Sequence, residues 1–213
     1  MQLLLVKELR LAVVLLLALA IIFHSGLGLF WALPVYAALI FLCFIARQLP
    51  RQVEAEPLTV RSPIDGVVVD VQYDLKHPWM KADEENISLQ RIRIRQHRLG
   101  EFVLHSPIEG KVLERWWPDK AGSGAKDFGF VVQADEGDRC VVDIVNAARP
   151  RFKTHFIPAG YRTRQGQRCG LIGMGVLADV YIAESALLKI EAGDQVKAGS
   201  DVLANFCPHH LTR

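Results

Sequence analysis

Cysteine is scarce in this sequence, and the formal charge is close to zero. Four cysteines occur in 213 residues, and no two of them form a Cys-x-x-Cys pair. This argues against a disulfide framework or a zinc site and is typical of reduced thiols in a cytoplasmic protein. The net charge of +2 gives no bulk electrostatic basis for binding nucleic acid. We therefore expect no metal site and no nucleic-acid partner.

Charged residues are also missing from two N-terminal segments. Residues 11–23 carry none, and residues 27–46 carry none over 20 positions, a length that can span the apolar core of a bilayer. The turn between them, residues 24–26, contains no Lys or Arg, whereas both outer ends do. By the positive-inside rule we predict a transmembrane helical hairpin over residues 1–47 in the inner membrane, with the rest of the chain in the cytoplasm. A cleaved signal peptide with residues 11–23 as its apolar region is the alternative.

No long pattern of helical period follows residue 50. Short runs rich in Val and Phe or Ile, at 67–69, 130–132 and 141–145, have strand composition instead. Residues 48–59 are rich in Gln, Glu and Pro, as expected for a polar linker. We therefore expect a linker over 48–59 and a mainly β domain over 60–213.

Two phrases of the β domain occur twice. Ser-Pro-Ile-x-Gly at residues 62–66 recurs at 106–110, and Ile-x-Ala-Gly at 157–160 recurs at 190–193, each followed by a further Gly six residues later. Both phrases are typical of a turn that leads into a strand, because Pro fixes one dihedral and Gly adopts a positive one. We predict a pseudo-symmetric β-barrel or sandwich of two similar halves, like the barrel-sandwich hybrids of lipoyl and biotinyl carriers.

The order of these phrases resembles the phosphatidylserine decarboxylase family over most of residues 44–206. The resemblance looks closest to the short branch that includes archaetidylserine decarboxylases. The family phrase S-P-A-D-G-x-V corresponds to residues 62–68, R-I-S-I-F-M to 91–96, and D-V-H-x-N-R-x-P-x-x-G-x-V to 100–112. Residues 166–182 resemble the segment G-x-R-F-G-x-I-x-F-G-S-R-x-D-V-Y-L, in which these enzymes cut themselves. In the family, the Ser of that segment attacks the preceding Gly carbonyl and becomes a pyruvoyl group, the electron sink for decarboxylation.

The departures from the family pattern fall on its chemistry. The Gly–Ser pair of the family is Gly175–Val176 here, and valine has no nucleophilic atom. The acid/base His of the family is Phe102, which cannot titrate. In a continuous strand, Glu101 and His105 would face away from Phe102, and we interpret His105 as a surface or packing histidine. The resemblance thus implies a protein that lacks the pyruvoyl cofactor and does not process itself.

We expect a phosphatidylserine decarboxylase-like membrane protein of phospholipid metabolism that has lost catalysis. Its partners would be membrane phospholipid and an active decarboxylase or another membrane protein. Candidate contacts to a lipid headgroup are Arg149, Arg151, Asp179 and His105. One alternative is an active phosphatidylserine or archaetidylserine decarboxylase with an unrecognised processing site; Ser123 and Ser200 each follow a glycine, but we interpret both as ordinary loop residues. Another is a lipoyl-like membrane adaptor module, although the sequence has no Met-Lys-Met phrase for attaching biotin or lipoate.

Overall fold

The computed structural model describes residues 10–46, 56–76, 88–97, 100–116, 128–145, 157–173 and 175–207. The chain divides into two compact units, Met1–Pro50 and Arg51–Arg213. The break between them falls within the predicted linker, residues 48–59. Each unit is described separately below.

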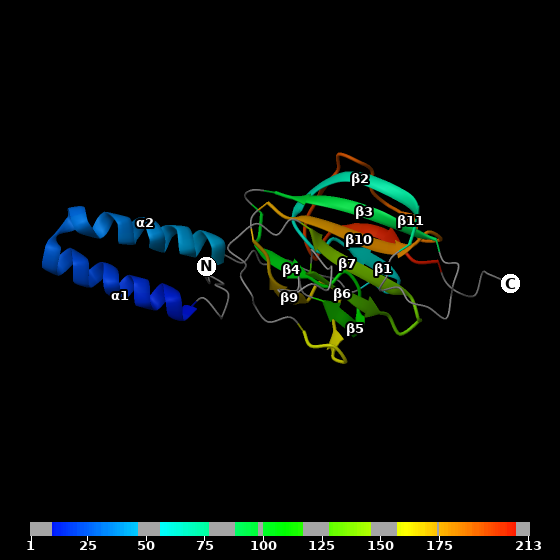
Figure 1. Ribbon diagram of the computed structural model, residues 1–213, viewed down its shortest axis with the longest axis horizontal. Helices are drawn as coiled ribbons and strands as arrows, with labels where there is room; N and C mark the ends of the chain where they lie inside the picture. The colour runs from blue at the N-terminus through cyan, green and yellow to red at the C-terminus, as the bar shows by residue number, and fades with distance from the viewer. Residues whose placement is uncertain are drawn as a thin grey trace, which may run out of the picture. The chain divides into compact units, whose positions relative to one another are not determined.

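The first unit consists of two helices that pack against each other, α1 (Arg10–Leu27) and α2 (Leu29–Ala46) (Figure 1). Both are apolar on most of their surface, so large apolar side chains remain exposed. Leu11, Phe30 and Trp31 are exposed at 60% to 78%. The two helices of the hairpin are therefore present as predicted. Across the described ranges, however, no helix has the length and hydropathy that a membrane crossing requires, so the predicted transmembrane span is not supported.

The second unit is mainly β, as predicted, and its described residues form three sheets. The strands are β1 (Thr59–Arg61), β2 (Gly66–Leu75), β3 (Leu89–Gln96), β4 (Val103–His105), β5 (Gly110–Trp116), β6 (Phe128–Gln133), β7 (Arg139–Val145), β8 (Arg162–Thr163), β9 (Arg168–Leu171), β10 (Leu177–Ala183), β11 (Leu187–Leu188), β12 (Gln195–Val196) and β13 (Val202–Asn205). The large sheet has the order β12-β2-β3-β10-β7-β6-β5-β8, and the smaller ones are β1-β13-β11 and β4-β9.

The large sheet curls into a half-barrel around the core. Figure 1 shows it running from β2 at the top through β3, β10 and β7 to β6 and β5 at the bottom. Alternation along the central strands separates its two faces. In β3, Ile92 and Ile94 are fully buried in the core. Arg91 and Arg93, which alternate with them, lie on the other face. In place of the predicted barrel or sandwich, the structure thus has one curled sheet and two small sheets.

The two repeated phrases occupy equivalent places in the fold. The backbone N–H of Arg61 donates to the carbonyl of Pro107 at 2.8 Å, and the N–H of His105 donates to the carbonyl of Pro63 at 2.9 Å. Each phrase therefore hydrogen-bonds to the other in the same way. The strand pairs agree with this, since β1 pairs with β13 as β4 pairs with β9, and β2 pairs with β12 as β5 pairs with β8.

The serines of the two phrases repeat the same local contacts. The hydroxyl of Ser62 donates to a carbonyl two residues later at 2.7 Å, and that of Ser106 does so at 2.8 Å. The carbonyl of Ser62 accepts from the N–H of Gly199 at 2.7 Å, and that of Ser106 accepts from Gly166 at 2.9 Å. The half built on residues 58–68 and 190–206 is therefore related to the half built on residues 102–112 and 157–172 by an approximate two-fold repeat.

Candidate functional site

The segment that resembles the family's self-processing site connects β9 to β10. Gly175 has a φ of 74° and no atom within 4 Å of where a Cβ would lie, so a turn in the left-handed region exposes it. Val176 follows and is fully buried in the hydrophobic core. Its carbonyl accepts from the backbone N–H of Gln96 at 3.0 Å, and its N–H donates to Gln96 Oε1 at 3.3 Å. Gln96 thus holds Val176 at the end of the β3–β10 ladder.

The chemistry available along this segment is limited. Val176 presents only methyl groups, and these face the core. Cys169, the nearby thiol, is 2% exposed, and burial raises its pKa from 9.0 to about 12. It is therefore protonated at neutral pH and is a poor nucleophile. No group on these two residues can attack the Gly175 carbonyl.

Phe102, at the family's acid/base position, is 2% exposed and lies directly before β4. Its carbonyl accepts from the N–H of Ile172 at 2.9 Å, which ties it to the end of β9. Its ring carries no group that can transfer a proton.

A buried polar cluster lies beside Phe102 and consists of Asp65, Glu101 and His105. Asp65 accepts from the N–H of Glu101 at 2.9 Å and from that of Ala198 at 2.7 Å. The carboxylate of Glu101 lies 3.3 Å from Nε2 of His105. All three side chains are at most 8% exposed. Glu101 and His105 are four residues apart, so strand alternation places both on one face, and their contact agrees with this.

Both ring nitrogens of His105 have partners. Nδ1 lies 2.8 Å from the carbonyl of Gly166, which can only accept, so Nδ1 is the donor in this contact. Nε2 faces the carboxyl group of Glu101 at 3.3 Å. Gly199 leaves room for this ring, since a Cβ there would lie 2.9 Å from Nδ1. His105 is therefore a buried, paired side chain.

Asp179 lies on the other face of the large sheet. It alternates with Ala178 and Val180, which are in the core. Arg93 binds both of its oxygens, at 2.7 and 2.6 Å, and Arg91 lies 3.9 Å away. The hydrogen bond to Asp179 is the main cause that raises the pKa of Arg93, against the opposing effect of burial. This strand neighbour of the self-processing segment is therefore an ion-pair partner within the sheet.

The structure brings some of the predicted site residues together and separates others. His105 contacts Glu101, whose backbone N–H binds Asp65, whereas Asp179 pairs with Arg93 on the face of the large sheet away from the core. Arg149 and Arg151 lie outside the described residues. The pairing of Asp65 with Glu101 was missed, although a buried acid in a turn phrase indicates backbone N–H partners. Among the residues with assigned positions, no group of three or more His, Cys, Asp or Glu side chains could hold a metal ion.

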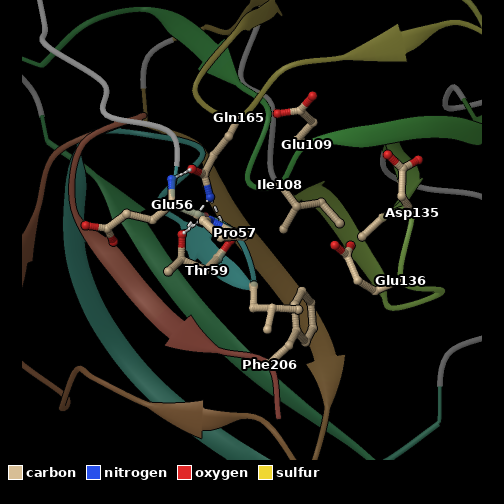
Figure 2. Close-up of a pocket in the computed structure, with 11 residues that line it drawn as sticks. Glu56, Pro57, Thr59, Ile108, Glu109, Asp135, Glu136, Gln165 and Phe206 are labelled. Carbon is tan, nitrogen blue, oxygen red and sulfur yellow. Dashed lines mark hydrogen bonds between the residues drawn. The ribbon is translucent and has the colours of Figure 1, made fainter. Parts of the chain in front are cut away.

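A pocket of about 180 Å³ lies at another part of the β unit, where several turns meet. We call it the acidic pocket. Its lining combines carboxylates with apolar side chains and one amide. These residues are Glu56, Pro57, Leu58, Thr59, Ile108, Glu109, Ala134, Asp135, Glu136, Gln165 and Phe206. Figure 2 shows the carboxyl groups of Glu109, Asp135 and Glu136 around one side of Ile108, and that of Glu56 on the other side.

Comparison with known proteins gives a consistent result over nearly the whole chain. It is 28% identical over 203 residues to the phosphatidylserine decarboxylase proenzyme of Aromatoleum aromaticum, covering 89% of this chain and 90% of that protein. It is 29% identical over 204 residues to the proenzyme of Cupriavidus pinatubonensis, covering 88% of each, and 28% identical over 202 residues to that of Nitrosomonas europaea, covering 89% of each. No protein-family model matches the chain. Together with the ordered phrases described above, these relatives support assignment of the chain to the phosphatidylserine decarboxylase family.

Proposed function

We propose that this protein is a member of the phosphatidylserine decarboxylase family that does not cut itself, carries no pyruvoyl group and acts at phospholipid membranes without catalysing decarboxylation. The observation that carries the proposal is Val176. The residue at the family's processing position has no side-chain oxygen, and it is fully buried in the hydrophobic core. Its role there is that of a packing residue.

The residues present do not fit a pyruvoyl group. Such a group would have to form from residue 176, and a valine has no hydroxyl that could attack the carbonyl of the preceding glycine. The second loss supports the same conclusion, because Phe102 cannot serve as an acid or base. A change at one position could reflect a local change of mechanism, whereas changes at both remove the nucleophile and the proton-transfer group together.

The active alternative would need another bond to break, and Ser200 is the described serine that follows a glycine. Its N–H donates to the carbonyl of Lys197 at 3.2 Å, and its carbonyl accepts from the guanidinium of Arg61. Gly199 donates to Ser62 at 2.7 Å. These contacts are those of an ordinary hydrogen-bonded turn. Ser123 lies outside the described residues.

Association with phospholipid is supported by the first unit. Its two helices expose many large apolar side chains, which soluble proteins rarely present in one patch. We propose that this surface contacts the inner membrane from the cytoplasmic side, where an active decarboxylase or another membrane protein would be the partner. Asp179 and His105 already bond within the protein, so Arg149 and Arg151 remain the candidates for a lipid headgroup.

The first test is the intact mass of the full-length protein, with a hydrazide probe for carbonyl groups on the same sample. We expect one uncut chain of 23.8 kDa with no label. Two fragments with a labelled new N-terminus would contradict the proposal. In that case, loss of cutting in Ser200→Ala would assign the reaction to that serine.

A second test addresses the lipid. The full-length protein should float with vesicles, and more strongly when they contain phosphatidylserine. Arg149→Gln with Arg151→Gln should lower the phosphatidylserine-dependent part, because headgroup attraction depends on positive charge. Arg115→Gln, an exposed arginine on β5, is the matched control. Flotation that is independent of lipid composition in all three proteins would refute the headgroup assignment.

A further inference from the structure

The approximate two-fold repeat relates the acidic pocket to the region around Phe102. The carbonyl of Phe102 accepts from the N–H of Ile172 at 2.9 Å, and the carbonyl of Leu58 accepts from the N–H of Phe206 at 2.7 Å. Leu58 and Phe206 both line the acidic pocket. The pocket therefore lies, in the half built on residues 58–68 and 190–206, at the place that Phe102 and Ile172 occupy in the half built on residues 102–112 and 157–172.

The acid of the repeated phrase differs between the two places. Asp65 turns inward and binds the N–H groups of Glu101 and Ala198, which closes that region. Its counterpart Glu109 is exposed and lines the pocket. Gln165 precedes Gly166 as Ala198 precedes the equivalent Gly199. The region around Phe102 is thus filled by side chains, whereas the equivalent region around Leu58 is an open pocket.

Gln165 holds one wall of the pocket in place. Its amide nitrogen donates to the carbonyl and the hydroxyl of Thr59, both at 2.7 Å, and its oxygen accepts from the N–H of Glu56 at 3.1 Å. Figure 2 shows these bonds as dashed lines. Leu58, within the same wall, has a φ of 61°, a conformation that is rare for leucine. The open shape is therefore built by specific contacts.

The charge around the pocket is unbalanced. Asp135 pairs with Arg162 at 2.6 Å, the positive charge of Arg162 also attracts Glu109, and Glu56 lies 3.9 Å from Arg61. Glu109 and Glu136 form no salt bridge with any residue that the structure describes. The apolar side chains of Leu58, Ile108 and Phe206 also line the pocket, and we call them its apolar floor. An anion would be repelled here, whereas a cation with an apolar body would satisfy both features.

We infer that the acidic pocket binds a small alkylammonium compound, with its ammonium group among Glu109, Asp135 and Glu136 and its alkyl part on the apolar floor. A bare metal ion fits poorly, because the described carboxylates do not converge closely enough to hold one. The volume of about 180 Å³ exceeds by an order of magnitude the roughly 10–15 Å³ that one water needs. A short chain with one charged end fits this space. This inference is independent of whether the protein decarboxylates a lipid.

The test is an NMR titration of the full-length protein with n-butylammonium, with n-butanol and n-butyrate as neutral and anionic probes of similar shape. We expect saturable shifts of the backbone amides of Leu58 and Asp135 and of the Gln165 side-chain amide. The apparent affinity should fall with added salt, because these carboxylates are exposed. Equal binding of n-butanol, or no saturable shift at these groups, would overturn the inference.

Variants separate charge from shape. Glu109→Gln and Glu136→Gln should each weaken n-butylammonium by about two- to fivefold, as expected for partly exposed charge pairs. Glu114→Gln, an exposed carboxylate on β5 that does not line the pocket, should leave the affinity unchanged. Ala134→Leu should abolish binding by filling the space. Equal affinities in all four variants would refute the site. If N-acetyl-lysine amide bound more tightly than n-butylammonium, the inference of a small-molecule ligand would be wrong, and the ligand would be a lysine side chain of a protein partner.

Discussion

Two Asp–Arg pairs of equal length allow the contribution of burial to be measured in one molecule. Arg93 lies 2.6 Å from Asp179, and Arg162 lies 2.6 Å from Asp135. The side chain of Asp179 is 2% exposed, whereas that of Asp135 is 65% exposed. Asp179→Asn removes the charge that compensates Arg93 while keeping the side-chain size. Breaking a buried pair in this way costs about 3–5 kcal/mol of unfolding free energy.

Two features of the structure lower that figure. Arg93 is 29% exposed, so water can recover part of its solvation. Asp143 lies directly opposite Asp179 on β7, and like charges in such a pair repel each other. We therefore expect Asp179→Asn to cost about 2–3 kcal/mol, measured by urea unfolding of the full-length chain. Asp135→Asn should give no measurable change, because exposed pairs contribute little. Equal effects of the two substitutions would refute the reasoning from burial.

Three further predictions concern the core and the buried polar cluster. Burial raises the pKa of Cys169 from 9.0 to about 12 in the folded protein, so the unfolded chain loses this proton first as the pH rises. The free energy of unfolding should therefore be unaffected below pH 9 and should fall between pH 9 and 12, by up to about 1.4 kcal/mol per pH unit. Cys169→Ala should reduce this fall in urea unfolding measured at several pH values. Val176→Thr should cost about 1–3 kcal/mol in the same assay, because it places a hydroxyl in the apolar core without a partner; a stability equal to that of the wild type would contradict the assigned packing. Gly199→Ala should lower the melting temperature more than Gly193→Ala, since both have positive φ but only the first adds a Cβ 2.9 Å from His105 Nδ1; equal shifts would show that backbone strain alone matters.

The fold could be predicted from the sequence where a local pattern determines the structure. The uncharged runs at 11–23 and 27–46 correspond to α1 and α2, and the runs at 67–69, 130–132 and 141–145 lie in β2, β6 and β7. The repeated phrases predicted two similar halves, and their reciprocal hydrogen bonds bear this out. What these patterns could not give is how strongly the sheet closes, because curvature depends on bulges such as those in β2 and β5.

The candidate site was less predictable, because its contacts join residues that are far apart in the chain. Val176 could be recognised from one substitution in a known phrase. The even spacing of Glu101 and His105 places them on one face, but their contacts with Asp65 and Gly166 join segments that are far apart in the chain. The role of Asp179 depends on its register with Arg93 on a neighbouring strand, and strand pairing cannot be read from either strand alone.

The two halves of the β unit show how one framework supports different uses. Their turns and strand pairs are alike, so the framework depends on the Ser-Pro-Ile-x-Gly phrases and the paired glycines. The side chains placed on it differ. Asp65 binds inward and Phe102 fills its region, whereas Glu109 stays exposed and Leu58 borders a pocket. Valine at residue 176 is compatible with this framework, because Val176 packs into the core and its backbone bonds to Gln96. The loss of catalysis that we propose would therefore leave the fold in place, and the alkylammonium ligand that we infer would bind at the equivalent open position.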